Sequence, residues 1–214
     1  MLIVITGTAS GIGKAAAETF LRAGHTVCGV DLAASAIDHP GYHHVVGDIR
    51  DTALDLPAPE ILINNAGTLE EHDAIDVNLT GTIRFTERFL DSAALRSVLF
   101  IASASARNGA EFPYYVASKA GLVGYMKNLA LQLAPRRVTV NSISPGGVIT
   151  PANRDILESE RQYDAVKAET LLGKWAEPEE IAALAYFLTV TNKSITGEDI
   201  LIDNGEMLKS NFIW

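Results

Sequence analysis

The chain has 214 residues, 48% of them hydrophobic and 20% charged, which is ordinary for one compact globular domain with a sizeable core. The formal net charge of −9 disfavours a nucleic-acid partner, because phosphate binding needs clustered lysine and arginine. No apolar run approaches the ~18 residues that a membrane helix needs, so no membrane partner is expected. The absence of a signal-peptide pattern and the single cysteine, Cys28, predict a cytoplasmic location.

Short β-branched apolar runs alternate with longer helical patterns along the chain. Nearly all-apolar strands are expected where helices cover both faces of a sheet. The predicted strands span residues 2–5, 26–30, 43–46, 61–63, 98–101, 138–143 and 200–202. The predicted helices lie near residues 12–23, 78–92, 116–133 and 178–190. This alternation predicts an α/β fold, a single Rossmann-type doubly wound parallel sheet of about seven strands with helices on both faces, in one domain over residues 1–214.

A glycine-rich turn, TGTASGIG at residues 6–13, follows the first predicted strand and leads into a helix. Its glycines allow a tight turn and a close approach of the backbone to a pyrophosphate, and the helix N-terminus supplies free N–H groups. Such a turn can also be a simple connection, but the strand–turn–helix context favours a dinucleotide site. The residues expected to bind the cofactor here are Gly7, Ser10, Gly11, Ile12 and Gly13.

The second predicted strand ends at Asp31, where a carboxylate can accept hydrogen bonds from the ribose hydroxyls of an adenosine. The same carboxylate would repel a 2′-phosphate, and neither Ser10 nor Leu32 supplies a compensating positive charge. These observations predict NAD rather than NADP as the cofactor. The alternative interpretation of Asp31 is a turn residue that ends a strand.

The adjacent pair His43 and His44 would point to opposite faces of the third predicted strand. Two neighbouring histidines without further ligands are weak support for a metal ion. The sequence therefore predicts no metal site.

Together with Tyr-Val-Ala-Ser-Lys at residues 115–119, the glycine-rich turn and Asp31 resemble the short-chain dehydrogenase/reductase family. The resemblance covers essentially the whole chain, and its motifs stand in the expected order. It implies that the catalytic residues are Asn78, Ser103, Tyr115 and Lys119. It implies further cofactor contacts from Asp48, Ile49, Asn65, Ala66, Gly67, Tyr115, Lys119, Pro145, Gly146, Val148 and Thr150. The stretch 49–77 is shorter than the family usually carries, which predicts a smaller or more open wall at the entrance.

Tyr115 and Lys119 are one helical turn apart, so both side chains can reach the same cleft. A nearby ammonium favours the phenolate, so Tyr115 is expected to act as general base in alcohol oxidation and as general acid in the reverse reaction. By resemblance, Lys119 holds the nicotinamide ribose, Ser103 orients the substrate oxygen, and Asn78 anchors a water linked to Lys119. Singly, each residue could be structural, and Ser105 is close enough to replace Ser103.

Residues 151–176 lie where the family usually places its substrate lid and mix charged with apolar side chains. The expected substrate is an apolar secondary alcohol or ketone, alicyclic or hydroxysteroid-like. The alternatives are an NADPH-dependent 3-oxoacyl or carbonyl reductase and a non-catalytic NAD-sensing module, whereas an enoyl reductase would space its tyrosine and lysine more widely. The resemblance also implies a homodimer or homotetramer, and the apolar tail 212–214 is expected to pack on a partner's pocket or on its own core.

Overall fold

The computed structural model describes residues 1–209, so the tail 212–214 lies outside the described residues. Its strands form one sheet in the order β3-β2-β1-β4-β5-β6-β7, and each neighbouring pair is parallel. The strands are β1 (Leu2–Thr6), β2 (Thr26–Asp31), β3 (Tyr42–Val46), β4 (Ile61–Asn64), β5 (Ser97–Ile101), β6 (Thr139–Pro145) and β7 (Asp199–Ile202). The predicted Rossmann-type sheet is confirmed, and the strand order reverses between β1 and β4, where open α/β sheets bind ligands.

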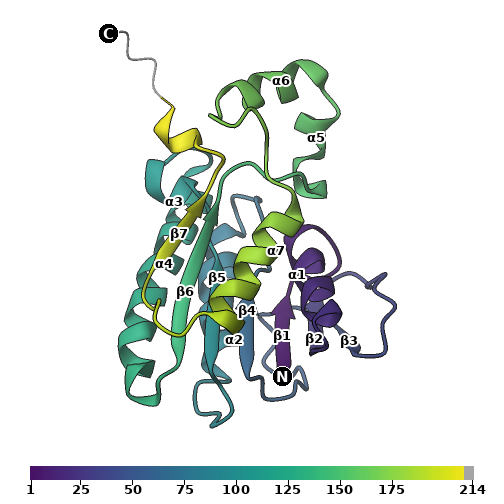
Figure 1. Cartoon of the computed structure of the whole chain (residues 1–214), viewed down its shortest axis with the longest axis vertical. Helices are drawn as coiled ribbons and strands as arrows, with labels where there is room; N and C mark the ends of the chain where they lie inside the picture. Colours follow the sequence, from purple (N-terminus) through teal and green to yellow (C-terminus); the bar gives the residue numbers. More distant parts are fainter. Residues whose placement is uncertain (210–214) are drawn as a thin grey trace.

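Helices cover both faces of this sheet, as Figure 1 shows. The α-helices are α1 (Gly11–Arg22), α2 (Thr82–Glu87), α3 (Ser105–Asn108), α4 (Pro113–Leu133), α5 (Arg154–Leu157), α6 (Glu160–Ala168) and α7 (Pro178–Tyr186). The π-helical turns are η1 (Ile75–Gly81) and η4 (Phe187–Thr191), and the 3₁₀ turns are η2 (Ala134–Arg136), η3 (Pro151–Asn153) and η5 (Glu206–Leu208). Helices α5 and α6 stand beyond the carboxyl ends of the strands (Figure 1). Both belong to the predicted lid segment, residues 151–176.

Alternation along the strands divides the core between the two faces, because successive side chains of a strand point in opposite directions. Ile3 of β1 packs in a cluster with Phe20 of α1 and Ile181 of α7. Val4, the next residue, packs in a second cluster with Phe85 of α2 and Met126 of α4. All six side chains are fully buried, so the sheet is covered on both sides.

The helix boundaries differ from the prediction in three places. The helix predicted near 178–190 keeps its regular part only to Tyr186 and continues as the π-helical turn η4. The segment predicted as a helix over 78–92 begins at Ile75 as the π-helical turn η1 and ends its regular part at Glu87. The helix predicted from residue 116 begins at Pro113, because proline is tolerated in the first turn, where its missing N–H costs no helical bond. Residues 47–60 contain neither helix nor strand, in agreement with the expectation of a shortened segment. None of the helices in the part of the chain that the structure describes is long and apolar enough to cross a membrane.

Candidate active site

A cavity of about 570 Å³ brings together residues that the sequence predicted separately. Its lining includes three of the expected catalytic residues, Ser103, Tyr115 and Lys119. The expected cofactor residues in the lining are Ile12, Asn65, Gly67, Pro145, Gly146, Val148 and Thr150. The other expected site residues lie outside this lining: Gly7, Ser10, Gly11, Gly13, Asp31, Asp48, Ile49, Ala66 and Asn78.

Lys119 lies on α4 with its side chain buried. Its ammonium donates a hydrogen bond of 3.0 Å to the carbonyl oxygen of Ile101 at the end of β5. The Nζ atom lies 5.6 Å from the centroid of the Tyr115 ring. Burial lowers the pKa of Lys119 to about 8, because the charged form loses its hydration. Lys119 is therefore held at the cavity wall next to Tyr115 and is poised to change its protonation state near neutral pH.

The pKa of the Tyr115 phenol differs from the lowered value that the sequence predicted. Burial raises the pKa of its phenol to about 12, the hydroxyl of Ser103 acts in the opposite direction, and the carboxylate of Glu111 raises it further. Desolvation of the phenolate is the largest cause of this shift, whereas the expectation of a lowered pKa rested on the nearby ammonium of Lys119. In this state Tyr115 is a neutral phenol, which is the form that donates a proton.

The two serines after β5 have distinct positions. The hydroxyl of Ser105 donates a 2.7 Å hydrogen bond to Oγ of Ser103, and the backbone N–H of Ser105 lies 3.2 Å from the same atom. Of the two serines, Ser103 is the one whose hydroxyl lowers the pKa of the Tyr115 phenol. This geometry favours Ser103 over Ser105 as the residue that faces the reacting oxygen, with Ser105 as its support.

Asn78 lies on the π-helical turn η1 and is fully buried. Its Oδ1 accepts a 2.7 Å hydrogen bond from the N–H of Thr68, and its Nδ2 donates to the carbonyl oxygen of Thr68 at 2.9 Å and to Oγ of Ser118 at 3.2 Å. A Cβ placed on Gly67 would lie 3.0 Å from Asn78 Oδ1 and 3.4 Å from Lys119 Nζ. The Asn78 side chain therefore joins η1 to the loop after β4 and to α4, close behind Lys119.

The glycine-rich turn fits a dinucleotide pyrophosphate. Gly7 and Gly11 have positive φ angles of 76° and 52°, which favour glycine, and a Cβ on Gly13 would overlap with the carbonyl oxygen of Gly7. Ser10 caps α1 without a side-chain hydrogen bond among the described residues, so the first-turn N–H groups are available to an anion. Asn65 supports the turn from β4, because its Nδ2 donates to the carbonyl oxygens of Thr6 at 3.0 Å and Gly7 at 3.1 Å.

Asp31 stands at the carboxyl end of β2 beside this turn. Its Oδ2 accepts a 2.9 Å hydrogen bond from the N–H of Ala9, and its Oδ1 accepts a 3.0 Å bond from the N–H of Ala33. A carboxylate oxygen can accept two hydrogen bonds, so each oxygen keeps capacity for a ribose hydroxyl. The position therefore suits the role that the sequence predicted for it.

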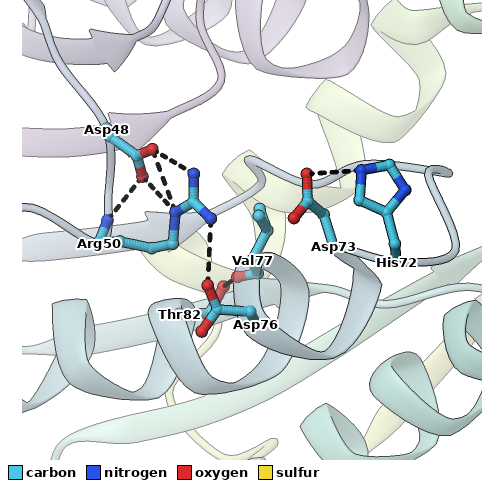
Figure 2. Close-up of polar contacts among 7 residues, drawn as sticks. All are labelled: Asp48, Arg50, His72, Asp73, Asp76, Val77 and Thr82. Atoms are coloured by element: carbon cyan, nitrogen blue, oxygen red, sulfur yellow. Dashed lines mark hydrogen bonds and ion pairs between the residues drawn. The ribbon is translucent and has the colours of Figure 1, made fainter.

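Asp48 is joined to a residue that the sequence reasoning missed, Arg50 (Figure 2). The guanidinium of Arg50 contacts Asp48 at 2.7 Å and reaches Asp76 of η1 at 3.0 Å. Hydrogen bonds from Arg50 hold the pKa of the Asp48 carboxyl below its usual value, so it stays ionised. A Cβ on Gly81 would lie 2.9 Å from Cγ of Arg50, so this glycine leaves room for the arginine stem across η1. The sequence signal for this ion pair is the spacing alone, a basic residue two positions after Asp48.

Two carboxylates at the cavity were also not foreseen. Glu111 and Glu206 both line it, from the loop before α4 and from η5. Glu111 has a φ angle of 82°, a conformation that non-glycine residues rarely adopt and that is often found at functional sites. Partial burial and the neighbouring Glu206 raise the pKa of Glu111. No short sequence motif marks either residue.

Comparison with known proteins places the whole chain among enzymes. The family model described as enoyl-(acyl carrier protein) reductase matches residues 58–206. The chain is 32% identical to D-threitol dehydrogenase of Mycolicibacterium smegmatis, over 96% of this chain and 92% of the relative. It is also 32% identical to the 3-oxoacyl-[acyl-carrier-protein] reductase FabG of Thermotoga maritima, over 94% of this chain and 96% of that one.

A solved structure has the same fold over its full length. It is a 4-hydroxyisoleucine dehydrogenase mutant in complex with NADH and succinate, with a TM-score of 0.85 and 28% identity over 99% of this chain and 100% of the other. The match of the family model, the two relatives and the converging site residues agree with the resemblance that the sequence carries. The chain therefore belongs to the short-chain dehydrogenase/reductase family and is an oxidoreductase for substrates of the alcohol or ketone type.

Proposed function

We propose that the protein is an NAD-dependent dehydrogenase that interconverts a secondary alcohol and a ketone. The observation that carries this proposal is the convergence of Ser103, Tyr115 and Lys119 on one cavity that also reaches the residues around the glycine-rich turn. Asp31 supports NAD over NADP, because its carboxylate occupies the position where a 2′-phosphate would be repelled.

Bound NAD would accept or donate the hydride at its nicotinamide ring. In ketone reduction, the neutral phenol of Tyr115 donates its proton to the substrate oxygen while Ser103 holds that oxygen by a hydrogen bond. In alcohol oxidation, the phenolate of Tyr115 accepts the proton and becomes the neutral phenol, and the positive charge of Lys119 favours the phenolate that this step requires. Lys119 also binds the ribose next to the nicotinamide, and Asn78 fixes η1 behind it, where the family resemblance places a water.

The substrate side of the cavity combines an apolar wall with carboxylates. Its larger apolar lining residues are Leu69, Phe112, Ile156, Val166 and Trp175. Three of these come from residues 151–176, which supports the proposal that this segment is a substrate lid. The apolar wall suits the alicyclic or hydroxysteroid-like substrate that we expect, while the names of the relatives draw attention to small hydroxylated substrates as well.

The carboxylates argue against the alternative of a 3-oxoacyl reductase. Glu111, Glu169 and Glu206 line the cavity, and the catalytic Lys119 is the one lysine or arginine in that lining among residues 1–209. A phosphate-bearing carrier arm would meet net negative charge there. The enoyl reductase activity in the description of the family model is disfavoured by the four-residue spacing of Tyr115 and Lys119. A sensor without turnover has no use for both residues in one cavity.

The experiment that tests this proposal measures the reduction of NAD to NADH with a panel of steroids, alicyclic alcohols and polyols. NADP is run in parallel, and Tyr115→Phe is the control. Turnover with NAD that disappears in Tyr115→Phe is the expected result. NADH binding without turnover anywhere would favour the sensor, and equal or better turnover with NADP would contradict the role of Asp31. Size-exclusion chromatography with light scattering tests the proposed homodimer or homotetramer.

A further inference from the structure

A chain of side-chain hydrogen bonds joins the glycine-rich turn to the loop after β2. The hydroxyl of Thr8, in the turn, lies 2.9 Å from the hydroxyl of Tyr42 on β3. The Tyr42 hydroxyl lies 2.8 Å from Nδ1 of His44, two residues further along the same strand. Nε2 of His44 lies 2.9 Å from the carbonyl oxygen of Ala33. Four residues from three separate segments are thereby linked end to end.

The carbonyl at one end fixes the direction of every bond in this chain. A carbonyl oxygen only accepts, so Nε2 of His44 carries a hydrogen and donates to Ala33. In the neutral imidazole, Nδ1 is then the acceptor, and the hydroxyl of Tyr42 donates to it. The oxygen of Tyr42 remains free to accept from the hydroxyl of Thr8. Protonation of His44 would put a hydrogen on Nδ1 as well and remove the acceptor that Tyr42 uses.

The strand between these segments is shaped to let the chain pass. Gly29 of β2 pairs with His44 of β3 in the sheet register. A Cβ on Gly29 would overlap with the Tyr42 hydroxyl and with Oγ1 of Thr8. Thr8 itself is fully buried. Any larger residue at position 29 would displace the contact between Thr8 and Tyr42, so the contact depends on this glycine.

The same two segments are also joined by Asp31. Its carboxylate accepts from Ala9 in the turn and from Ala33 in the loop, while the Tyr42–His44 chain holds Thr8 in the turn and the carbonyl of Ala33 in the loop. Two separate links therefore connect the turn to the loop: one is the Asp31 carboxylate, and the other is the Tyr42–His44 chain. Asp31 is also the one charged residue of β2, and it pairs with Val46 of β3, two residues beyond His44.

We propose that Tyr42 and His44 are positioning residues for cofactor binding, which hold the turn and the loop at the separation in which Asp31 receives the adenosine ribose. This inference rests on the proposed use of a nicotinamide dinucleotide. Neither side chain lines the catalytic cavity among the described residues, so their effect falls on dinucleotide affinity and leaves the hydride-transfer rate at saturation unchanged. His43 offers a matched control, because it is adjacent in the sequence and exposed.

The test is calorimetric titration of ADP-ribose and of NADH into the full chain and into the variants Tyr42→Phe, His44→Leu and His43→Leu. ADP-ribose carries the adenosine ribose and the pyrophosphate but no nicotinamide. Tyr42→Phe and His44→Leu each remove two hydrogen bonds of the chain, and each should weaken ADP-ribose binding about fivefold or more, whereas His43→Leu should stay within about twofold.

The outcomes separate the two proposals. If the wild type binds neither ADP-ribose nor NADH, the proposed cofactor is wrong. If the wild type binds both and the Tyr42 and His44 variants bind as tightly, the positioning role is wrong. Thr8→Val provides a further variant if Tyr42→Phe does not fold, with the same expected loss. A fall in kcat at saturating NAD in His44→Leu, with affinity unchanged, would also overturn the inference.

Discussion

The two ends of the proposed cofactor cleft use different physical means. At the adenosine end, Asp31 and Asp48 are partly accessible carboxylates held by backbone N–H groups or by Arg50. At the catalytic end, Tyr115 and Lys119 are largely removed from water, and burial is the main cause of both pKa shifts. Under the proposed function, cofactor binding is distributed over many modest polar contacts, whereas the chemistry depends on the desolvation of two groups.

The largest effect is expected from Tyr115→Phe. Removal of the hydroxyl deletes the proton donor while the ring keeps its packing, so kcat should fall about 10²- to 10⁴-fold. NADH affinity should stay within about twofold, because the adenosine end is untouched. Steady-state kinetics and calorimetry on the same sample measure both quantities. A loss of less than about tenfold in kcat would remove Tyr115 from the chemistry.

The desolvation of Lys119 can be tested through the pH dependence of the free energy of unfolding. Its pKa is about 8 in the folded protein, against 10.5 for an ordinary lysine in water. The unfolded state therefore binds more protons between these values, and the free energy of unfolding should rise with pH over that range, by about 2 to 3 kcal/mol. Lys119→Met should lack this rise and lose activity. Urea unfolding at about pH 7.5 and about pH 10 compares the two proteins, and equal slopes would contradict a desolvated lysine.

Asp31→Ser removes the carboxylate from the adenosine end. NAD affinity should fall about tenfold, through loss of hydrogen bonds from the ribose hydroxyls to a charged group. The preference for NAD over NADP should fall as well, because the repulsion of the 2′-phosphate is gone. Kinetics with both cofactors measure the ratio. An unchanged ratio would show that Asp31 does not discriminate between them.

Arg50→Gln should give the smallest effect, because its ion pairs with Asp48 and Asp76 are partly exposed and such pairs contribute about 0 to 1 kcal/mol. We expect an NADH dissociation constant raised about twofold to fivefold with kcat unchanged. Arg50→Lys should not restore the wild-type value, since lysine cannot bind a carboxylate through a planar fork. A change of kcat in Arg50→Gln would mean that the ion pairs of Arg50 with Asp48 and Asp76 also affect the catalytic end of the cleft, through η1.

Much of the fold could be predicted because its signals are local. The strands are short apolar runs that helices bury on both faces, and each predicted strand lies within a residue or two of the observed one. Tyr115 and Lys119 could be paired because helical spacing brings them together. The expectations for the other site residues remain predictions, although Ser103 lines the same cavity as Tyr115 and Asp31 stands beside the glycine-rich turn.

The remainder depends on contacts between distant segments. The π-helical turn that carries Asn78 arises where its side chain joins Thr68 and Ser118, and no residue pattern within 75–81 announces it. The phenol of Tyr115 was expected at a lowered pKa because its charged neighbour is visible in the sequence and its burial is not. The same limit applies to Glu111, whose φ angle and place in the cavity follow from the loop before α4.

The most direct measurement is the single-turnover rate of hydride transfer together with the NADH dissociation constant, in the wild type, Tyr115→Phe and Asp31→Ser. The account predicts that Tyr115→Phe loses the rate and keeps the affinity, whereas Asp31→Ser loses affinity and keeps the rate at saturation. If both variants lose both properties, or if Tyr115→Phe transfers hydride at the wild-type rate, the division of the cleft into a binding end and a catalytic end is wrong.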